Sequence, residues 1–188
     1  MQKDRKARNE KKMQIEINEQ GSEAFYKETV NAAAQYRYIL KDHHYKLKDY
    51  FKQFRTLLIA SLLVLAVNVG LIIAWGGDTI QTAASAVLLV AALMCGAYLF
   101  SLHKACKSMM AGWHRSVLTL DESGAELDVP DTQTVKIARK NLAVVRIFNE
   151  SLCFVPQAGA GVVISVDRKL GAEIPDWIRE NWPEAEII

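Results

Sequence analysis

Hydrophobic positions along the chain follow two kinds of pattern. Two uncharged and mainly apolar runs, residues 56–77 and 79–102, occupy the middle of the sequence. Each is long enough for a helix that crosses the hydrocarbon core of a bilayer, which takes about 20 residues. The flanking segments instead show the helical or alternating periodicity of a folded domain. The pattern therefore predicts transmembrane helices at 56–77 and 79–102 within an otherwise water-exposed chain.

The two runs are separated by very few residues. Gly76, Gly77 and Asp78 are turn-formers, so we expect an antiparallel transmembrane hairpin. Asn68 is the only strongly polar side chain near the middle of the first run, where a single amide favours a hydrogen bond between helices. Both runs also carry small residues four apart, which let helices approach closely. We favour packing within this hairpin over an interface between copies for these helix-packing residues, which are Ala66, Gly70, Ala92 and Gly96.

The segment before the first run divides into three parts. Residues 1–12 are predominantly basic and are expected to be flexible. Residues 13–55 predict a strand followed by a long amphipathic helix, because 13–19 alternate apolar and polar while apolar residues in 23–54 recur every three or four positions. No proline interrupts 23–54, so we expect this helix to continue into the first span.

The segment after the second run, residues 103–188, changes period once. Residues 103–114 continue the second helix, and residues 117–166 then hold five or six short alternating runs bounded by turn residues. These predict a meandering antiparallel sheet or small barrel. A C-terminal helix begins near Ile174, where Pro175 suits the first turn. Because so short a segment makes a marginal core, we expect the strand at 13–19 and the long helix to complete one composite domain.

Charge sharpens this picture. The 188 residues carry a net charge of +2, but residues 1–55 hold 13 of the 23 Lys and Arg residues, residues 103–188 hold the other 10, and the spans and their connection hold none. The positive-inside rule therefore places both termini in the cytoplasm. Trp75 and Trp113 are the expected anchors at the two membrane interfaces. The opening charged residues lack the apolar core of a signal peptide, so the first span is expected to be an uncleaved anchor.

The order of elements carries a resemblance. A strand, a long helix, two spans, a hairpin at 117–129 (VLTLDESGAELDV) and strands at 142–155 precede a final helix. This is similar to the YcxB-like family of bacterial membrane proteins, whose C-terminal domain resembles a bacterial PH-like fold. The resemblance implies an α+β membrane protein with a cytoplasmic PH-like antiparallel sheet or barrel, capped by the C-terminal helix. It implies a bacterial inner-membrane location and no activity.

Candidate chemistry is sparse. The sequence has no phosphate-binding loop, nucleophile elbow or metal-ligand pattern, so we predict no enzyme, cofactor, metal or small-molecule substrate. A sustained basic face for nucleic acid is also absent. The first hairpin loop, residues 121–124, is acidic and would repel a phosphate headgroup. Candidate contacts to lipid or to a partner are the basic residues Lys136, Arg139, Lys140, Arg168 and Lys169.

Two hypotheses about function follow. The first is a nonenzymatic inner-membrane protein that presents its PH-like domain for protein interaction or regulation, with membrane lipids and either a protein partner or a homo-oligomer as its contacts. The second is an immunity protein that protects against a membrane-targeting toxin, because a small hairpin can pair with an invading helix. An adjacent toxin gene would favour the second hypothesis.

Overall fold

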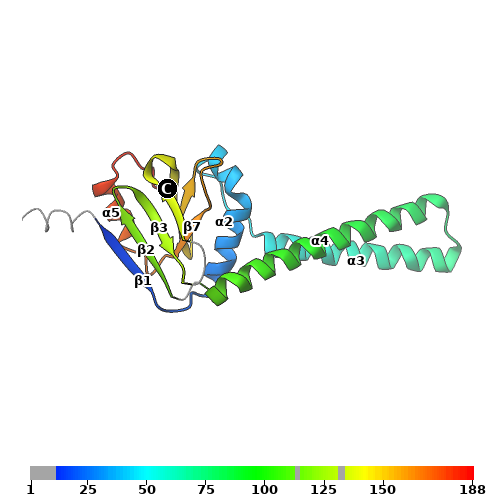
Figure 1. The fold of residues 1–188 in the computed structure, drawn as a ribbon. Helices are drawn as coiled ribbons and strands as arrows, with labels where there is room; N and C mark the ends of the chain where they lie inside the picture. Colours follow the sequence, from blue (N-terminus) through cyan, green and yellow to red (C-terminus); the bar gives the residue numbers. More distant parts are fainter. Residues whose placement is uncertain (1–11, 113–114, 131–133) are drawn as a thin grey trace, which may run out of the picture. The chain divides into compact units, whose positions relative to one another are not determined.

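A computed structural model describes residues 12–112, 115–130 and 134–188, which divide into two compact units. The first unit joins residues 1–47 to residues 106–188, and the second is residues 48–105. The first unit is therefore built from both ends of the chain around the inserted second unit, which confirms the expected composite domain. In chain order the elements are β1 (Met13–Ile17), α2 (Glu23–Lys41), α3 (Tyr50–Trp75), α4 (Thr79–Gly112), β2 (Ser116–Asp121), β3 (Gly124–Asp128), β4 (Val135–Ala138), η2 (Arg139–Asn141), β5 (Leu142–Ile147), β6 (Ser151–Pro156), β7 (Ile164–Asp167) and α5 (Ile174–Asn181) (Figure 1).

The strands form two antiparallel sheets. One has the order β1-β2-β3-β4 and the other β5-β6-β7. The edge strand from the N-terminal part of the chain pairs in register with β2, Met13 lying opposite Leu120 and Ile17 opposite Ser116. This confirms that the alternating segment near the N-terminus completes the sheet formed by the C-terminal meander.

The main core lies between the inner faces of the two sheets and is closed by α5. It includes Leu118 and Leu127 from the first sheet, Phe154 from the second, and Ile178 and Trp182 from the C-terminal segment. The Trp182 indole N–H is satisfied by the Asp121 carbonyl at 3.1 Å. Pro175 lies in the first turn of α5, as predicted.

A second layer covers the outer face of the three-stranded sheet. Strand β6 is buried along its whole length. Its successive side chains point to opposite faces of the sheet, and both faces are covered. Leu152 and Phe154 enter the core between the sheets, whereas Cys153 and Val155 pack with Ala32 and Ile39 of α2, which lies beside this sheet (Figure 1). The long helix thus covers a sheet face, as expected from its aromatic and apolar stripe.

The expected continuous helix from 23 to 54 is wrong, because α2 ends at Lys41 and α3 begins at Tyr50. Asp42 adopts an extended conformation, and its carboxylate accepts a hydrogen bond from the His44 N–H at 2.9 Å. Asp49 then caps α3 by accepting from the Lys52 N–H at 3.1 Å. The apolar periodicity runs through this break and hides it, whereas a short aspartate side chain readily satisfies backbone groups at a helix end.

The second unit is a helical hairpin. α3 has 26 residues and α4 has 34, so at 1.5 Å per residue they are about 39 Å and about 51 Å long, enough to span a membrane. Gly76 ends α3 with a positive φ of 79°, and Asp78 begins α4 by accepting from the Gln81 N–H at 2.7 Å. The turn at 76–78 and the extension of the second helix past residue 102 are both confirmed.

The alternation in β1 makes a direct test of the composite domain. Ile17 is buried in the main core, and its neighbour Glu16 is exposed on the opposite face. We expect Ile17→Ala to lower the free energy of unfolding of the domain by about 3 kcal/mol, because it leaves a cavity beneath the edge strand. Glu16→Ala, the matched control, should change it by less than about 0.5 kcal/mol. Urea unfolding in detergent, followed by tryptophan fluorescence, measures both; equal effects would contradict this register.

Candidate functional site

The Glu28 carboxylate of α2 accepts hydrogen bonds from the turn between β5 and β6. Its Oε1 accepts from the Asn149 N–H at 3.2 Å, and its Oε2 accepts from the Glu150 N–H and the Ser151 hydroxyl, both at 2.8 Å. Charge-assisted hydrogen bonds of this kind are stronger than neutral ones. One side chain from the N-terminal part of the chain therefore orders a loop more than 120 residues away.

A buried polar row lies on the same sheet face. The Cys153 Sγ is 3.0 Å from the Ser165 Oγ and 3.5 Å from the Ser151 Oγ. Burial raises the pKa of the Cys153 thiol to about 11, so it stays protonated at neutral pH. A nucleophilic cysteine has to be accessible and ionised to the thiolate, and Cys153 is neither. The row therefore serves packing beneath α2.

Arg146 is the one arginine of the described residues that the fold buries. It is 7% exposed, its Nη2 donates to the Tyr45 carbonyl at 3.1 Å, and its guanidinium carbon lies 5.2 Å from the centre of the Phe148 ring. Burial lowers the pKa of Arg146, although an arginine has enough margin to remain charged. The sequence signal for this residue was a single charge within the apolar run 142–148.

The C-terminal residues lie along the free edge of β5. Ile187 forms a parallel bridge with Val145, and the Ile147 N–H donates to the Ile188 carbonyl at 2.7 Å. Nothing in the sequence pattern predicted this extra strand-like segment, because five residues are too few to show a period. It places the acidic residues Glu184 and Glu186 beside the cationic residues of the domain.

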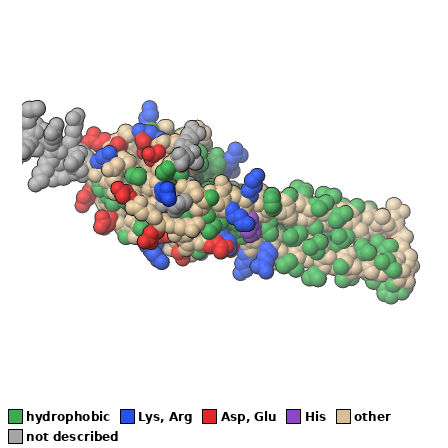
Figure 2. Space-filling view, turned by 60° about the horizontal axis from the view of Figure 1, so that its bottom comes forward, with side chains coloured by type: hydrophobic (Ala, Val, Ile, Leu, Met, Phe, Trp, Pro, Cys, Tyr) green, Lys and Arg blue, Asp and Glu red, His purple; other side chains and the backbone are tan. Residues whose placement is uncertain are grey.

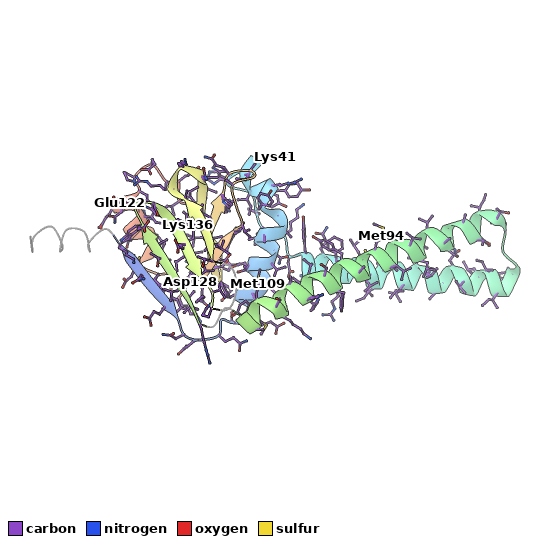
Figure 3. All side chains as sticks on the ribbon, in the orientation of Figure 1. Lys41, Met94, Met109, Glu122, Asp128 and Lys136 are labelled. Carbon is purple, nitrogen blue, oxygen red and sulfur yellow. The ribbon has the colours of Figure 1, made fainter. Side chains whose placement is uncertain are left out.

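The five predicted basic residues do not form one site. Lys136 pairs with Glu126 at 3.0 Å on the outer surface of the first sheet, where Figure 3 labels Lys136, and Arg139 pairs with Glu184 through its Nη2 at 2.6 Å. Lys140 lies in the 3-10 helix η2, just before β5. Arg168 and Lys169 follow β7, and the Arg168 N–H donates to the carbonyl of Glu150, which lies beyond the end of β5. Six strand residues, or about 20 Å, separate the two groups.

Neither group forms a deep basic pocket. Arg168 and Lys169 share a shallow depression with Glu150 and Asp167, which balances its charge. The first hairpin loop is acidic, and hydrogen bonds from Ser123 and Gly124 lower the pKa of Asp121, which keeps its carboxylate ionised. Both features disfavour a phosphate headgroup at these positions.

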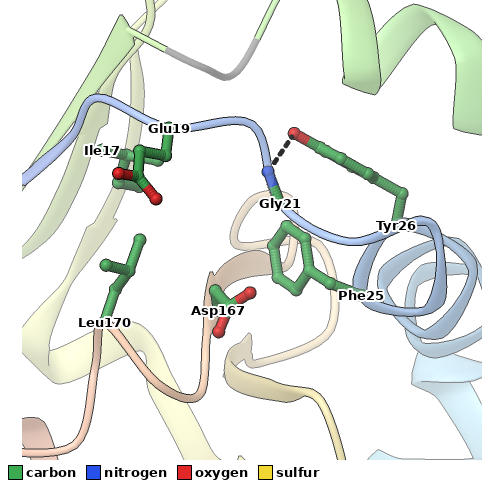
Figure 4. Close-up of a pocket in the computed structure, with 7 residues that line it drawn as sticks. All are labelled: Ile17, Glu19, Gly21, Phe25, Tyr26, Asp167 and Leu170. Atoms are coloured by element: carbon green, nitrogen blue, oxygen red, sulfur yellow. Dashed lines mark hydrogen bonds between the residues drawn. The ribbon is translucent and has the colours of Figure 1, made fainter.

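A small cavity beside β1 is also too confined for a ligand (Figure 4). Its volume is about 10 Å³, roughly the space of one water molecule. The Tyr26 hydroxyl closes one side by accepting from the Gly21 N–H at 3.2 Å, and burial raises the pKa of this phenol. Among the described residues there is no cluster of three or more His, Cys, Asp and Glu side chains that would hold a metal.

The surface of the helical hairpin is formed mainly by exposed apolar side chains. No side chain in the most apolar stretch of α3 is buried, and 6% of those in α4 are buried. Figure 2 shows hydrophobic side chains over most of this unit, and Figure 3 labels Met94, which is 68% exposed on α4. The described residues thus leave these apolar side chains uncovered, unlike the core helices of a soluble domain.

Asn68 joins the two helices as predicted. Its Nδ2 donates to the Ser85 Oγ at 2.7 Å and to the Gln81 carbonyl at 3.1 Å. The small residues are divided: Ala92 is buried, but Ala66 and Gly70 are exposed and a methyl group added at Gly70 or Gly96 would meet nothing within 4 Å. Packing within the hairpin therefore accounts for Ala92 only, which corrects the expectation for Ala66, Gly70 and Gly96.

The two predicted interface anchors have different outcomes. Trp75 is 80% exposed at the last residue of α3, next to the turn. Trp113 lies outside the described residues.

Comparison of the chain with protein-family models, with curated proteins and with solved structures finds no match. The likeness to the YcxB-like family therefore stays a prediction from the order of elements.

The carboxylate of Glu28 offers a test of how α2 is held. We expect Glu28→Ala to lower the free energy of unfolding by about 2 kcal/mol, because it leaves the donors of the 149–151 turn without their acceptor. The control on the same helix is Glu23→Ala, which removes an exposed pair with Lys27 and should cost less than about 1 kcal/mol. Thermal or urea unfolding distinguishes them; a control as costly as the Glu28 variant would contradict the anchoring role.

Burial of Cys153 predicts its reactivity. In a variant that keeps only this cysteine, a maleimide at pH 7.5 should react with Cys153 only after denaturation, because the thiol is enclosed and its pKa is raised to about 11. A thiol introduced by Lys140→Cys, at an exposed position of η2, provides the accessible control. Mass spectrometry of labelled protein measures both sites. Equal rates in the folded protein would show that α2 does not cover this face.

Proposed function

We propose that the chain is a nonenzymatic protein of the bacterial inner membrane, anchored by its apolar hairpin. The observation that carries this proposal is the uncovered apolar surface of α3 and α4, which a bilayer would accommodate. In water such a surface would drive association, because monomeric soluble proteins rarely expose large apolar patches. Helices of these lengths satisfy their backbone hydrogen bonds internally, as a hydrocarbon environment requires.

In the proposed orientation both termini and the α+β domain lie in the cytoplasm. The support is the charge distribution, since Lys and Arg flank the outer ends of the hairpin and are absent from its turn. A PH-like description of the domain is part of the same proposal. It is supported by two antiparallel sheets of four and three strands that are closed by one C-terminal helix.

The role proposed for the domain is protein interaction or regulation at the membrane surface. Support comes from the sites that the described residues provide. A cavity of about 10 Å³ and a buried, protonated cysteine do not suit a small substrate. Basic residues that are already paired with carboxylates do not suit an anionic headgroup. An exposed strand edge and a polar surface suit a protein partner. Lipids would then contact the hairpin, and the partner would contact the domain.

The orientation is tested by labelling two introduced thiols in a background without native cysteines. Thr79→Cys lies at the turn of the hairpin, and Lys140→Cys lies on the surface of the α+β domain. A membrane-impermeant maleimide added to intact spheroplasts should label the first site, and it should label the second only after permeabilisation. The reverse order would contradict the orientation. Extraction of the protein by alkaline carbonate would contradict membrane insertion altogether.

The interaction role is tested by crosslinking in the native membrane. A photoreactive amino acid at Lys140 or Arg168 samples the two separated ends of the three-stranded sheet. We expect adducts with a specific second protein, identified by mass spectrometry, and far fewer adducts from a matched position on the hairpin such as Met94. Adducts only between copies of this chain would favour a self-contained oligomer and contradict the proposed partner.

A further inference from the structure

The last five residues of the chain behave as an added strand on β5. The Val145 N–H donates to the Glu186 carbonyl at 2.9 Å, the Ile188 N–H donates to the Val145 carbonyl at 3.0 Å, and the Ile147 N–H donates to the Ile188 carbonyl at 2.7 Å. This is the parallel hydrogen-bonding pattern of an extended peptide against a sheet edge. We refer to residues 184–188 as the tail.

The side chains of the tail fit three features of the domain. Glu184 binds both the Nε and the Nη2 of Arg139, and the Glu186 Oε2 lies 2.5 Å from the His43 Nδ1. Ile187 packs against the core between the sheets, whereas Ile188 packs against the cluster beneath α2. We refer to the edge of β5 together with these contacting residues as the groove. In this structure it accommodates two acidic side chains two positions apart, followed by two aliphatic side chains.

The groove also holds a buried charge. Arg146 is a β5 residue whose pKa is lowered by burial, and the negative charges of Asp42 and Glu186 act in the opposite direction. Its Nε and Nη1 have no hydrogen-bond partner among the described residues. Of the acidic groups that face it, Asp42 comes from the end of α2 and Glu186 comes from the tail. The cationic side of the groove thus consists of Arg139, Arg146 and, when protonated, His43.

The tail lies at the surface of the domain. Pro183 separates it from the buried Trp182, all of its residues are partly or fully exposed, and its pairing with β5 is an isolated bridge. A partly exposed segment that is held to a sheet edge by an isolated bridge can open at a lower free energy than the whole domain. Once the tail leaves, β5 presents unpaired N–H and C=O groups, which is the template that an incoming extended peptide recognises.

We propose that the groove along β5 is a peptide-binding site for a partner protein, occupied in this state by the chain's own tail. The partner would insert an extended segment that resembles the tail, with two acidic residues separated by one residue and followed by aliphatic residues. Binding would then compete with the tail, so the tail holds the site closed until the partner is present. This inference rests on the proposed interaction role and names the partner's chemistry.

The test uses the full chain in detergent and a fluorescent copy of residues 183–188 (PEAEII). In the variant Glu184→Lys with Glu186→Lys the tail loses both carboxylates, and we expect the peptide to bind at least tenfold more tightly than it binds the wild type. Glu180→Lys is the matched control, because Glu180 is an exposed residue of α5 outside the tail, and it should bind the peptide as the wild type does. Adding Arg139→Ala to the double variant should lose most of the gain. Fluorescence anisotropy measures each affinity.

Three results would overturn the proposal. The first is a folded double variant that binds the peptide no more tightly than the wild type. The second comes from hydrogen exchange of the wild-type chain, which requires no variant to fold: the amides of Val145 and Ile147 should exchange faster than those of β6, and exchange only through global unfolding would exclude an opening tail. The third is peptide-sensitive dimerisation of the chain, which would assign the groove to a second copy. Failure in these assays leaves the labelling test of membrane orientation unaffected.

Discussion

The fold depends on the burial of β6 from both sides. All side chains of this strand are apolar or weakly polar, and successive ones point to opposite faces, so both faces have to be buried. The C-terminal strands and α5 bury only one of these faces. The other is covered by α2, from the opposite side of the hairpin in sequence. Because neither terminal part buries this strand alone, the two parts have to close on each other, and the two apolar helices become an insertion between them.

This arrangement explains why single side chains act over long sequence distances. Glu28 orders the β5–β6 turn, and β1 completes the sheet begun by the C-terminal segment. The same closure leaves β5 with one free edge, which the tail covers. A domain assembled in this way is joined to the hairpin at two points of the sequence. Proteolysis or mutation of the N-terminal part should therefore destabilise the C-terminal part, although the two are remote in sequence.

The surfaces of the two units carry different chemistry. The hairpin exposes apolar side chains and satisfies its one central amide internally, so it is suited to a uniform apolar surrounding. The domain exposes mixed charges, some of which pair with one another, including Lys136 with Glu126 and Arg139 with Glu184. Specific recognition by the domain is therefore expected at a strand edge, where backbone groups and a short pattern of side chains act together, rather than through net charge.

The sequence by itself determined the elements whose signal is local. The two apolar runs, the turn at Gly76–Asp78, the alternation of β1 and β2 and the start of α5 at Ile174 follow from periodicity and turn chemistry. Tertiary structure decided what depends on partners distant in the chain. The break after Lys41 is stabilised by aspartate caps that apolar periodicity does not report. The roles of Glu28, Arg146 and the tail arise only when residues more than 40 positions apart meet, because hydrogen bonds and burial are set by neighbours in space.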